Sequence, residues 1–386
     1  MAAAPNLEDP LAGTDATLSE RLGDVVDPEL DQPIGPLGYL RQLTIDAAGT
    51  RVTLAMPIGA WPSKAAVEAG VVAALADAGY PDGVVDVVTM TDEERLALRH
   101  HLRGEMEAEP GPGQHHHGPP PPKILSPDSS TRILGISSGK GGVGKSSVTV
   151  NLAIALRQLG YQVGLLDADV YGFSVPKMLG CDHDPVVLAD MVIPTETHGV
   201  RCLSMGFFVP DDQPVIWRGP MLHKAIEQFL GDAFWGNPDF LLIDMPPGTG
   251  DVALTLSQVV PRVEIYVVTT PQAAAQRVAQ RSAFAARKLK LAVRGVIENM
   301  SYFVGDDGTR YELFGAGGGQ VLAQDLGLPL LGQVPLVPEL RAGGDSGLPI
   351  TISDPEASAS LAFQSIAERI VAQGPARVYR QELKLS

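Results

Sequence analysis

Cysteine is almost absent from this chain: Cys181 and Cys202 are the two that occur in 386 residues. Two cysteines exclude a disulfide-rich scaffold and suit a reducing compartment, so we expect a cytoplasmic protein. Long apolar runs are missing too. We find no stretch of 18 or more apolar residues that would predict a transmembrane helix. Residues 1–9 have neither the basic segment nor the apolar core of a secretion signal.

Basic residues are in deficit, with 29 Lys and Arg against 45 Asp and Glu and a formal net charge of −16. Nucleic-acid backbones are held mainly by Lys and Arg, and the same cations attract anionic membrane surfaces. We therefore expect neither a nucleic-acid partner nor a membrane partner.

Proline and glycine are plentiful, and many of them gather between residues 107 and 130. Such a composition predicts a semi-rigid, solvated linker. The sequence thus predicts a small α/β domain at 1–107, a linker at 108–130 and a larger domain at 131–386. Three histidines, His115–His117, lie in the linker. They would bind a metal ion only with further fixed ligands nearby, so a polar tract is the favoured interpretation.

The first 107 residues combine two kinds of hydrophobic period. Helices are expected at 18–26, at 63–78 and from 92 onward, and strands at 40–45, 51–56 and 84–90. Ser63 and Thr91 are the expected N-caps of the last two helices. Apolar and polar residues alternate through 51–56, which predicts a half-buried hairpin strand.

Strands and helices alternate after residue 131. Strands are expected at 131–138, 163–167, 200–205, 240–244, 263–269, 293–297 and 330–334, and helices at 145–159, 220–234, 271–289 and 355–373. Thr270 is the expected N-cap and Pro271 the first residue of the 271–289 helix. This order predicts an α/β fold with a mainly parallel sheet covered by helices on both faces.

Residues 139–146, Gly-Lys-Gly-Gly-Val-Gly-Lys-Ser, match the pattern of a phosphate-binding loop between a strand and a helix. Glycines permit positive φ angles, so backbone N–H groups can face phosphate oxygens, and the helix that follows adds its positive end. Lys145 would neutralise the β- and γ-phosphates of ATP, and the Ser146 hydroxyl would bind Mg²⁺. The predicted nucleotide-binding residues are Gly139, Lys140, Gly141, Gly142, Val143, Gly144, Lys145, Ser146 and Ser147.

Carboxylates end two of the expected strands. The 240–244 strand would deliver Asp244 to Mg²⁺ at the edge where such sheets bind ligands. Asp167 and Asp169 are two residues apart and would face one site, Asp167 ordering the metal's water shell and Asp169 the attacking water. The Gly248 N–H would sense the γ-phosphate, as switch loops do. Alternatively, Asp244 caps a helix and Asp167–Asp169 is a polar strand end.

The second loop residue, Lys140, makes the loop similar to the deviant Walker A loop of the MinD, ParA and nitrogenase iron-protein class. That resemblance implies a homodimer with two ATP molecules at its interface and Lys140 acting in trans. Five longer strings resemble the Mrp family of iron–sulfur cluster carrier ATPases: Asp167–Gly172, Trp217–Lys224, Asp244–Asp251, Glu298–Phe303 and Phe314–Gly319. The resemblance implies ATP hydrolysis, with Lys140, Lys145 and Asp169 as catalytic residues and apo iron–sulfur clients or assembly factors as partners. It also implies that Asn299 and the turn at Pro335 lie near the adenine.

The chain departs from this family at its cysteines. Mrp relatives usually carry Cys-x-x-Cys after Ser-Tyr-Phe, but residues 301–309 hold no cysteine. The small domain resembles an iron–sulfur assembly domain through Asp27–Leu30, yet Trp61-Pro-Ser63 stands where its reactive cysteine is expected. An iron–sulfur cluster is therefore implied by resemblance alone. Cys202 is expected in the core. Cys181 lies beside Asp182 and His183, where a metal-ligand role is the less favoured interpretation.

Two other functions compete with a cluster carrier. One is an ATP-driven adaptor or switch of the same family without a cluster, which the missing Cys-x-x-Cys favours. The other is a MinD- or ParA-like positioning ATPase, which would need a basic face or tail. The expected helix at 355–373 has one basic residue, Arg369, and so disfavours that alternative.

Overall fold

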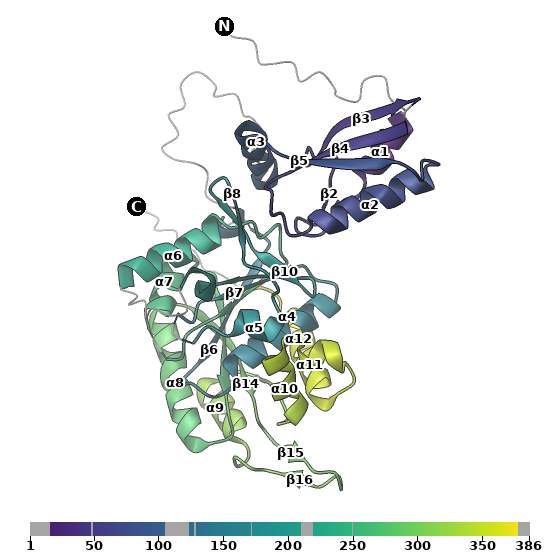
Figure 1. The fold of residues 1–386 in the computed structure, drawn as a ribbon. Coiled ribbons are helices and arrows are strands. Elements are labelled where there is room, and N and C mark those ends of the chain that lie inside the picture. The colour runs from purple at the N-terminus through teal and green to yellow at the C-terminus, as the bar shows by residue number, and fades with distance from the viewer. Residues whose placement is uncertain are drawn as a thin grey trace, which may run out of the picture. The chain divides into compact units, whose positions relative to one another are not determined.

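The computed structural model describes residues 16–47, 49–104, 123–126, 129–170, 172–209, 219–248 and 250–376. The described residues form two compact units (Figure 1). The first contains the residues up to 104 together with Val186–Ile193, and the second contains the others. His115–His117 and most of the predicted linker lie outside the described residues, so the domain boundaries at 107 and 130 stay predictions.

The first unit is built on a three-stranded sheet with the order β3–β4–β5. Its main elements are α1 (Ala16–Gly23), β3 (Leu40–Asp46), β4 (Gly49–Met56), α2 (Lys64–Asp77), β5 (Val84–Thr89) and α3 (Asp92–Arg103). Strands β3 and β4 form an antiparallel hairpin, and β5 runs parallel to β4. Val52, Leu54 and Met56 are buried, as the alternation predicted. Two small antiparallel pairs also belong to this unit: β1 (Val26–Asp27) with β2 (Gln32–Pro33), and β8 (Val186–Leu188) with β9 (Met191–Ile193).

A buried carboxylate organises this unit. Asp27 is fully buried, and it accepts hydrogen bonds from Tyr39 Oη at 2.6 Å and from Trp61 Nε1 at 2.8 Å. Ser63 precedes α2 as expected, but its hydroxyl makes no capping bond and donates to Asp27 at 2.6 Å. Ser63 is therefore the N-cap residue of α2, as predicted, but it gives no side-chain capping bond because the buried carboxylate takes its hydroxyl. Thr91 caps α3 as predicted, in a capping box with Glu94.

An eight-stranded sheet forms the second unit, and seven of its strands are parallel to one another. The strands lie in the order β10 (Thr195–Thr197), β11 (Val200–Ser204), β7 (Val163–Asp167), β12 (Phe240–Asp244), β6 (Arg132–Ser138), β13 (Glu264–Thr269), β14 (Ala292–Glu298) and β17 (Leu330–Gln333). Strand β10 pairs antiparallel to β11. The predicted α/β fold is confirmed. Because β7 and β12 run in register, Asp167 and Asp244 end side by side at one edge of the sheet.

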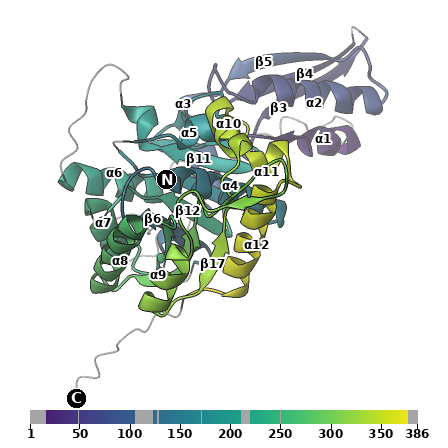
Figure 2. The ribbon, with the colours of Figure 1, turned by 90° about the horizontal axis from the view of Figure 1, so that it is seen from below.

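Helices cover both faces of this sheet (Figures 1 and 2). One face carries α4 (Lys145–Gln158), α5 (Val175–Leu179), α10 (Pro338–Ser346), α11 (Ile350–Ser353) and α12 (Ser358–Ala372). The other carries α6 (Gly219–Gly231), α7 (Asp251–Val259), α8 (Ala273–Lys288) and α9 (Gly318–Leu326). Residues 148–156 of α4 are all buried, because α4 is enclosed between the sheet and α12. This burial fixes the direction in which α4 leaves the loop at 139–144.

The start of α8 differs from the prediction. The helix begins at Ala273 with Gln272 as its N-cap, so Thr270 is not the cap and Pro271 is not the first helical residue. Strand β13 pairs with β14 through Thr269, so the strand reaches the residue just before Thr270. Short helices such as α5 and α7 were not predicted. No helix within the described residues is long and apolar enough to cross a membrane.

Candidate functional site

A cavity of about 640 Å³ lies in the second unit, next to the strand ends that carry the two aspartates. Ligands of open α/β sheets bind at this edge. The cavity is lined by Ser138, Lys140, Gly141, Gly142, Val143, Gly144, Lys145, Ser146, Ser147, Asp169, Val170, Gly172, Ser174, Met178, Leu222, Pro246, Pro247, Gly250, Asp251 and Val252. Eight of the nine residues predicted to form the phosphate loop are in this set, and Gly139 is the exception.

The loop between β6 and α4 has the backbone that its glycines permit. Gly142 and Gly144 have φ angles of +79° and +75°, which other residues rarely adopt. Gly139 is needed for space, since a Cβ there would lie 2.2 Å from the backbone N of Ala279. Lys145 begins α4, so the positive end of the helix faces the cavity. The geometry suits an anion such as a phosphate.

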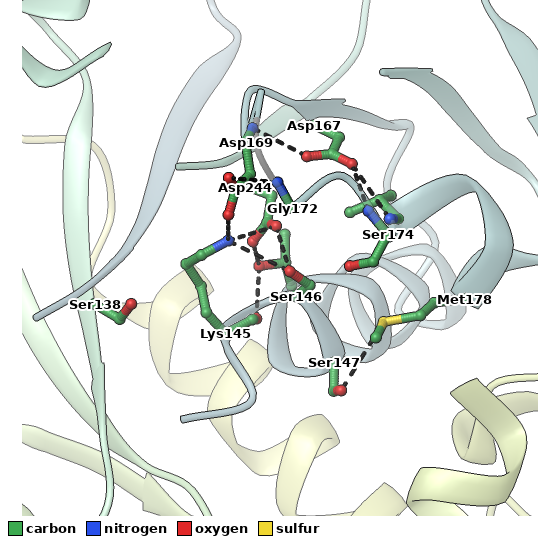
Figure 3. Close-up of polar contacts among 12 residues, drawn as sticks. Ser138, Lys145, Ser146, Ser147, Asp167, Asp169, Gly172, Ser174, Met178 and Asp244 are labelled. Carbon is green, nitrogen blue, oxygen red and sulfur yellow. Dashed lines mark hydrogen bonds and ion pairs between the residues drawn. The ribbon is translucent and has the colours of Figure 1, made fainter. Parts of the chain in front are cut away.

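Asp244 connects the loop to the sheet (Figure 3). Its Oδ2 accepts hydrogen bonds from Lys145 Nζ and from Ser146 Oγ, both at 2.6 Å. Its Oδ1 accepts one from Thr149 Oγ1 at 2.6 Å. Asp244 and Lys145 are both buried, and a buried charge of either sign is costly without its partner. The cluster therefore holds the lysine and the serine hydroxyl against the end of β12.

Asp167 accepts hydrogen bonds from several donors, of which those from Asp169 and Ser174 can be followed in Figure 3. Its carboxylate accepts from the backbone N–H groups of Asp169, Ser174 and Val175 at 3.1–3.3 Å, and from Ser204 Oγ at 3.1 Å. Burial, and secondly the charge of Asp244, raise the pKa of Asp167 to about 7. Because these bonds hold the carboxylate in place, it can order groups around it. A role for Asp167 at a metal ion stays a prediction.

Among the described residues, Asp169 is one of two acidic residues that line the cavity, the other being Asp251. Its Oδ2 lies 3.8 Å from Lys145 Nζ, and its Oδ1 accepts from the Gly172 N–H at 3.1 Å. The side chain is nearly buried but still lines the cavity. A carboxylate held in this way can accept a proton or orient a water molecule.

Lys140 also lines the cavity, and its Nζ lies 3.3 Å from Gln272 Oε1, at the start of α8. A neutral amide is a weaker partner than a carboxylate, so little holds the ammonium group in this position. The action of Lys140 on the nucleotide of a partner subunit stays a prediction, because the structure contains a single chain.

Both backbone polar groups of Gly248 are hydrogen-bonded. Its N–H donates to Ser138 O at 2.7 Å, and its carbonyl accepts from Ser282 Oγ at 3.1 Å. The predicted contact between this N–H and a γ-phosphate would require the bond to Ser138 to break.

Asn299 supports the phosphate loop from outside the cavity. Its Nδ2 donates to Val143 O at 2.9 Å, and neither Asn299 nor Pro335 is among the described residues that line the cavity. The predicted position of both residues near an adenine is left untested.

Sequence reasoning missed several residues of the site. Thr149 lies four residues after Lys145, so it shares a helix face with the loop lysine, and this spacing was a usable signal. Ser204 reaches Asp167 through the register between β11 and β7, which local sequence does not reveal. Ser174, Met178 and Asp251 line the cavity from short segments whose helices were not predicted.

The chain's two cysteines lie outside this cavity. Cys202 is fully buried in β11, as predicted, and Cys181 follows α5 with partial exposure. The described residues hold no group of three or more His, Cys, Asp or Glu side chains that could hold a metal ion.

The segment where relatives were expected to carry Cys-x-x-Cys is a short hairpin. It consists of β15 (Phe303–Val304) and β16 (Arg310–Tyr311), with the Arg310 guanidinium 3.9 Å from the ring centre of Tyr302. This hairpin offers no thiolate.

Comparison with known proteins identifies the family. The ParA model, which describes NUBPL iron-transfer P-loop NTPases, matches residues 129–371. The chain belongs to this family. It is similar to an iron–sulfur cluster carrier protein of Mycobacterium leprae, with 43% identity covering 88% of both chains. Another such carrier, from Synechocystis, is 39% identical, covering 92% of this chain and 96% of that protein. The family resemblance drawn from the sequence is thereby confirmed.

A solved structure supports the fold of the second unit. A nucleotide-binding protein from Archaeoglobus fulgidus, in complex with ADP, is 33% identical and has a TM-score of 0.51. The match covers 59% of this chain and 89% of that one.

Proposed function

We propose that this P-loop NTPase binds and hydrolyses ATP and uses the cycle to carry iron–sulfur clusters to apoproteins. The observation that carries the ATPase part is the contact of Lys145 and Ser146 with the Asp244 carboxylate, both at 2.6 Å, at the end of β12 beside the cavity. The family and the iron–sulfur carrier proteins it resembles support the cluster part.

ATP would lie with its phosphates against the loop from Gly139 to Ser147. Lys145 would exchange its contact with Asp244 for the β- and γ-phosphates, which offer a similar charge. Backbone N–H groups of the loop and the start of α4 would bind the remaining phosphate oxygens.

The donor set at Asp244 suits Mg²⁺, because the ion prefers oxygen ligands such as hydroxyls and carboxylates. Ser146 and Asp244 would hold it, and Asp167 would order its water shell. The bound ion would neutralise charge on the phosphates.

Two side chains would act on hydrolysis itself. Asp169 would orient the attacking water, since its carboxylate is held at the cavity wall by Gly172 N–H. Lys140 would come from the second copy of a homodimer and stabilise the charge that develops on the phosphates.

A calorimetric titration with Mg·ATP tests the nucleotide site. Charge-assisted contacts contribute about 1.5–3 kcal/mol, so Lys145→Ala should weaken binding at least about tenfold. Lys288→Ala is the matched control, because Lys288 is exposed and does not line the cavity. Removing Lys145 also leaves Asp244 without its cation, so the unfolding transition is measured alongside. A folded Lys145→Ala variant with wild-type affinity would refute the site.

A second function is favoured by the hairpin at 303–311. An ATP-driven switch of the same family that carries no cluster would need no cysteine there, and the hairpin has none. Both functions share the nucleotide site, and iron and sulfide analysis of anaerobically purified protein separates them.

A further inference from the structure

The two cysteines are 21 positions apart in sequence, but the fold brings them together. Cys202 belongs to the apolar core of the second unit, and Cys181 packs against that core from the end of α5. The side chains of Cys181 and Cys202 interact with each other, and the Thr197 side chain interacts with Cys181 as well. The two cysteines of the chain therefore form one pair in the fold.

Neighbouring bonds keep the pair aligned. Thr195 is the register partner of Cys202 in the β10–β11 hairpin, and its hydroxyl donates to His183 O at 2.8 Å. The Cys181 N–H donates to Pro176 O at 3.0 Å, which continues the end of α5. The segment carrying Cys181 is thus bound to β10 at the residue that pairs with Cys202.

The two thiols differ in reactivity. Cys181 is partly exposed, whereas Cys202 is fully buried. The hydrogen bond from Cys202 lowers the pKa of Cys181, which favours the thiolate that attacks disulfides. The bond to Cys181, together with burial, raises the pKa of Cys202. One cysteine is accessible and acidic, and the other is sheltered next to it.

We propose that Cys181 and Cys202 form a redox-reactive dithiol, with Cys181 as the attacking and Cys202 as the resolving thiol, which closes to an intramolecular disulfide. The oxidant would be a low-molecular-weight disulfide such as glutathione disulfide. The Cys181 thiolate attacks one glutathione sulfur, forms a mixed disulfide and releases one glutathione thiolate. The Cys202 thiol then attacks the Cys181 sulfur and releases the second glutathione as a thiolate, which takes up the proton of Cys202. Two electrons pass from the cysteines to the glutathione disulfide, which becomes two thiols.

The disulfide would join the end of α5 to the sheet. The other end of α5 is already bound, since the Ser174 and Val175 N–H groups donate to Asp167, and Met178 lines the cavity between the two ends. Closing the disulfide would therefore limit the motion of a wall of the nucleotide cavity.

The test treats the folded full-length protein with glutathione disulfide, blocks free thiols with iodoacetamide and measures the intact mass. Wild type should lose two hydrogens, take up no iodoacetamide and carry no glutathione. Cys202→Ala, which keeps a small apolar group in the core, should accumulate one glutathione on Cys181. Cys181→Ser should remain unmodified, because Cys202 is buried.

Three results would overturn the proposal: wild type with one or two alkylated cysteines, wild type with a lasting glutathione adduct, or dimers linked through disulfides. Hydrogen exchange of residues 174–181 tests the effect on α5. Exchange should slow on oxidation in wild type and not in Cys202→Ala. An oxidised wild type with unchanged exchange would overturn the restraint of α5.

Discussion

At the scale of single residues, the fold raises the pKa of Asp167, one of the carboxylates of the site. Its pKa is raised from 3.8 to about 7 by burial and by Asp244. The folded state therefore keeps a proton that the unfolded state loses above pH 4, so this residue stabilises the fold less as the pH rises toward 7. Above pH 7 Asp167 is ionised in both states, so its effect on the free energy of unfolding should no longer change with pH.

Urea unfolding of wild type and Asp167→Asn at pH 5 and pH 8, without nucleotide or Mg²⁺, measures this effect. Relative to the variant, wild type should lose about 2–3 kcal/mol of unfolding free energy between the two pH values. Comparing the two proteins removes the contribution of other titrating groups. A constant difference would mean that the four donors to Asp167 outweigh its burial.

The sequence predicted the residues of this site better than their partners. Spacing within the phosphate loop predicted Lys145 and Ser146, because that chemistry depends on consecutive residues. The bonds of Asp167 to Ser174 and Ser204 were out of reach, since they depend on how a loop and a neighbouring strand meet in three dimensions. The pairing of Cys181 with Cys202 was missed for the same reason.

At the scale of elements, Asp27 joins segments of the first unit that are distant in sequence. It lies on β1 and accepts bonds from Tyr39, Trp61 and Ser63, which precede β3 and α2. Asn cannot accept all of these bonds, and it leaves buried donors without an ionised acceptor. Asp27→Asn should lower the unfolding free energy of this unit by about 3 kcal/mol or more.

Hydrogen exchange of residues 26–63, followed with Mg·ATP titration, checks this prediction. Exchange should rise in Asp27→Asn while ATP affinity stays at the wild-type value. Asp31→Asn is the matched control because Asp31 is exposed and has a positive φ that Asn tolerates. Equal exchange in the two variants would contradict the role assigned to Asp27.

Element prediction succeeded where the periodic pattern was long. Strands β7 and β12 were predicted with their observed bounds, because continuous apolar runs between turns identify buried parallel strands. The predicted start of α8 was wrong, because β13 runs through Thr269 and the helix begins at Ala273, although Thr-Pro is a good local start signal. Short helices such as α5 are stabilised by packing and carry too few residues for a pattern.

For the whole molecule, the proposed dimer makes a prediction that single variants cannot test. Lys140→Ala and Asp169→Asn should each keep ATP binding and lose most turnover, about 100-fold or more, because both act on the transition state. If Lys140 acts in trans, a mixed dimer holds one site with both native residues. An equal mixture of the two variants should then recover about a quarter of wild-type turnover, since half of the dimers are mixed.

Phosphate release by each variant, by the mixture and by wild type measures this recovery. Lys288→Ala mixed with Asp325→Asn is the control, because both residues lie outside the cavity and the mixture should match wild type. A mixture as inactive as its components, after subunit exchange has been verified with differently tagged chains, would place Lys140 in its own site.

The family predicts that the protein binds an iron–sulfur cluster, whereas the small number of cysteines in the chain argues against tight binding. Iron–sulfur clusters are held by cysteine thiolates, usually four, and each chain has two cysteines. Cys202 is fully buried and its side chain interacts with Cys181, and the 303–311 hairpin offers no thiolate. A dimer would therefore have to bring two Cys181 side chains together, with other ligands from oxygen or nitrogen.

We predict weak and labile cluster binding. Anaerobic reconstitution with iron and sulfide, followed by gel filtration, should remove most of the iron–thiolate absorption band. A strong band that survives filtration and disappears in Cys181→Ser would show that the protein holds a cluster through Cys181 and that the prediction is wrong. A band that survives in a variant lacking both cysteines would identify the iron as adventitious.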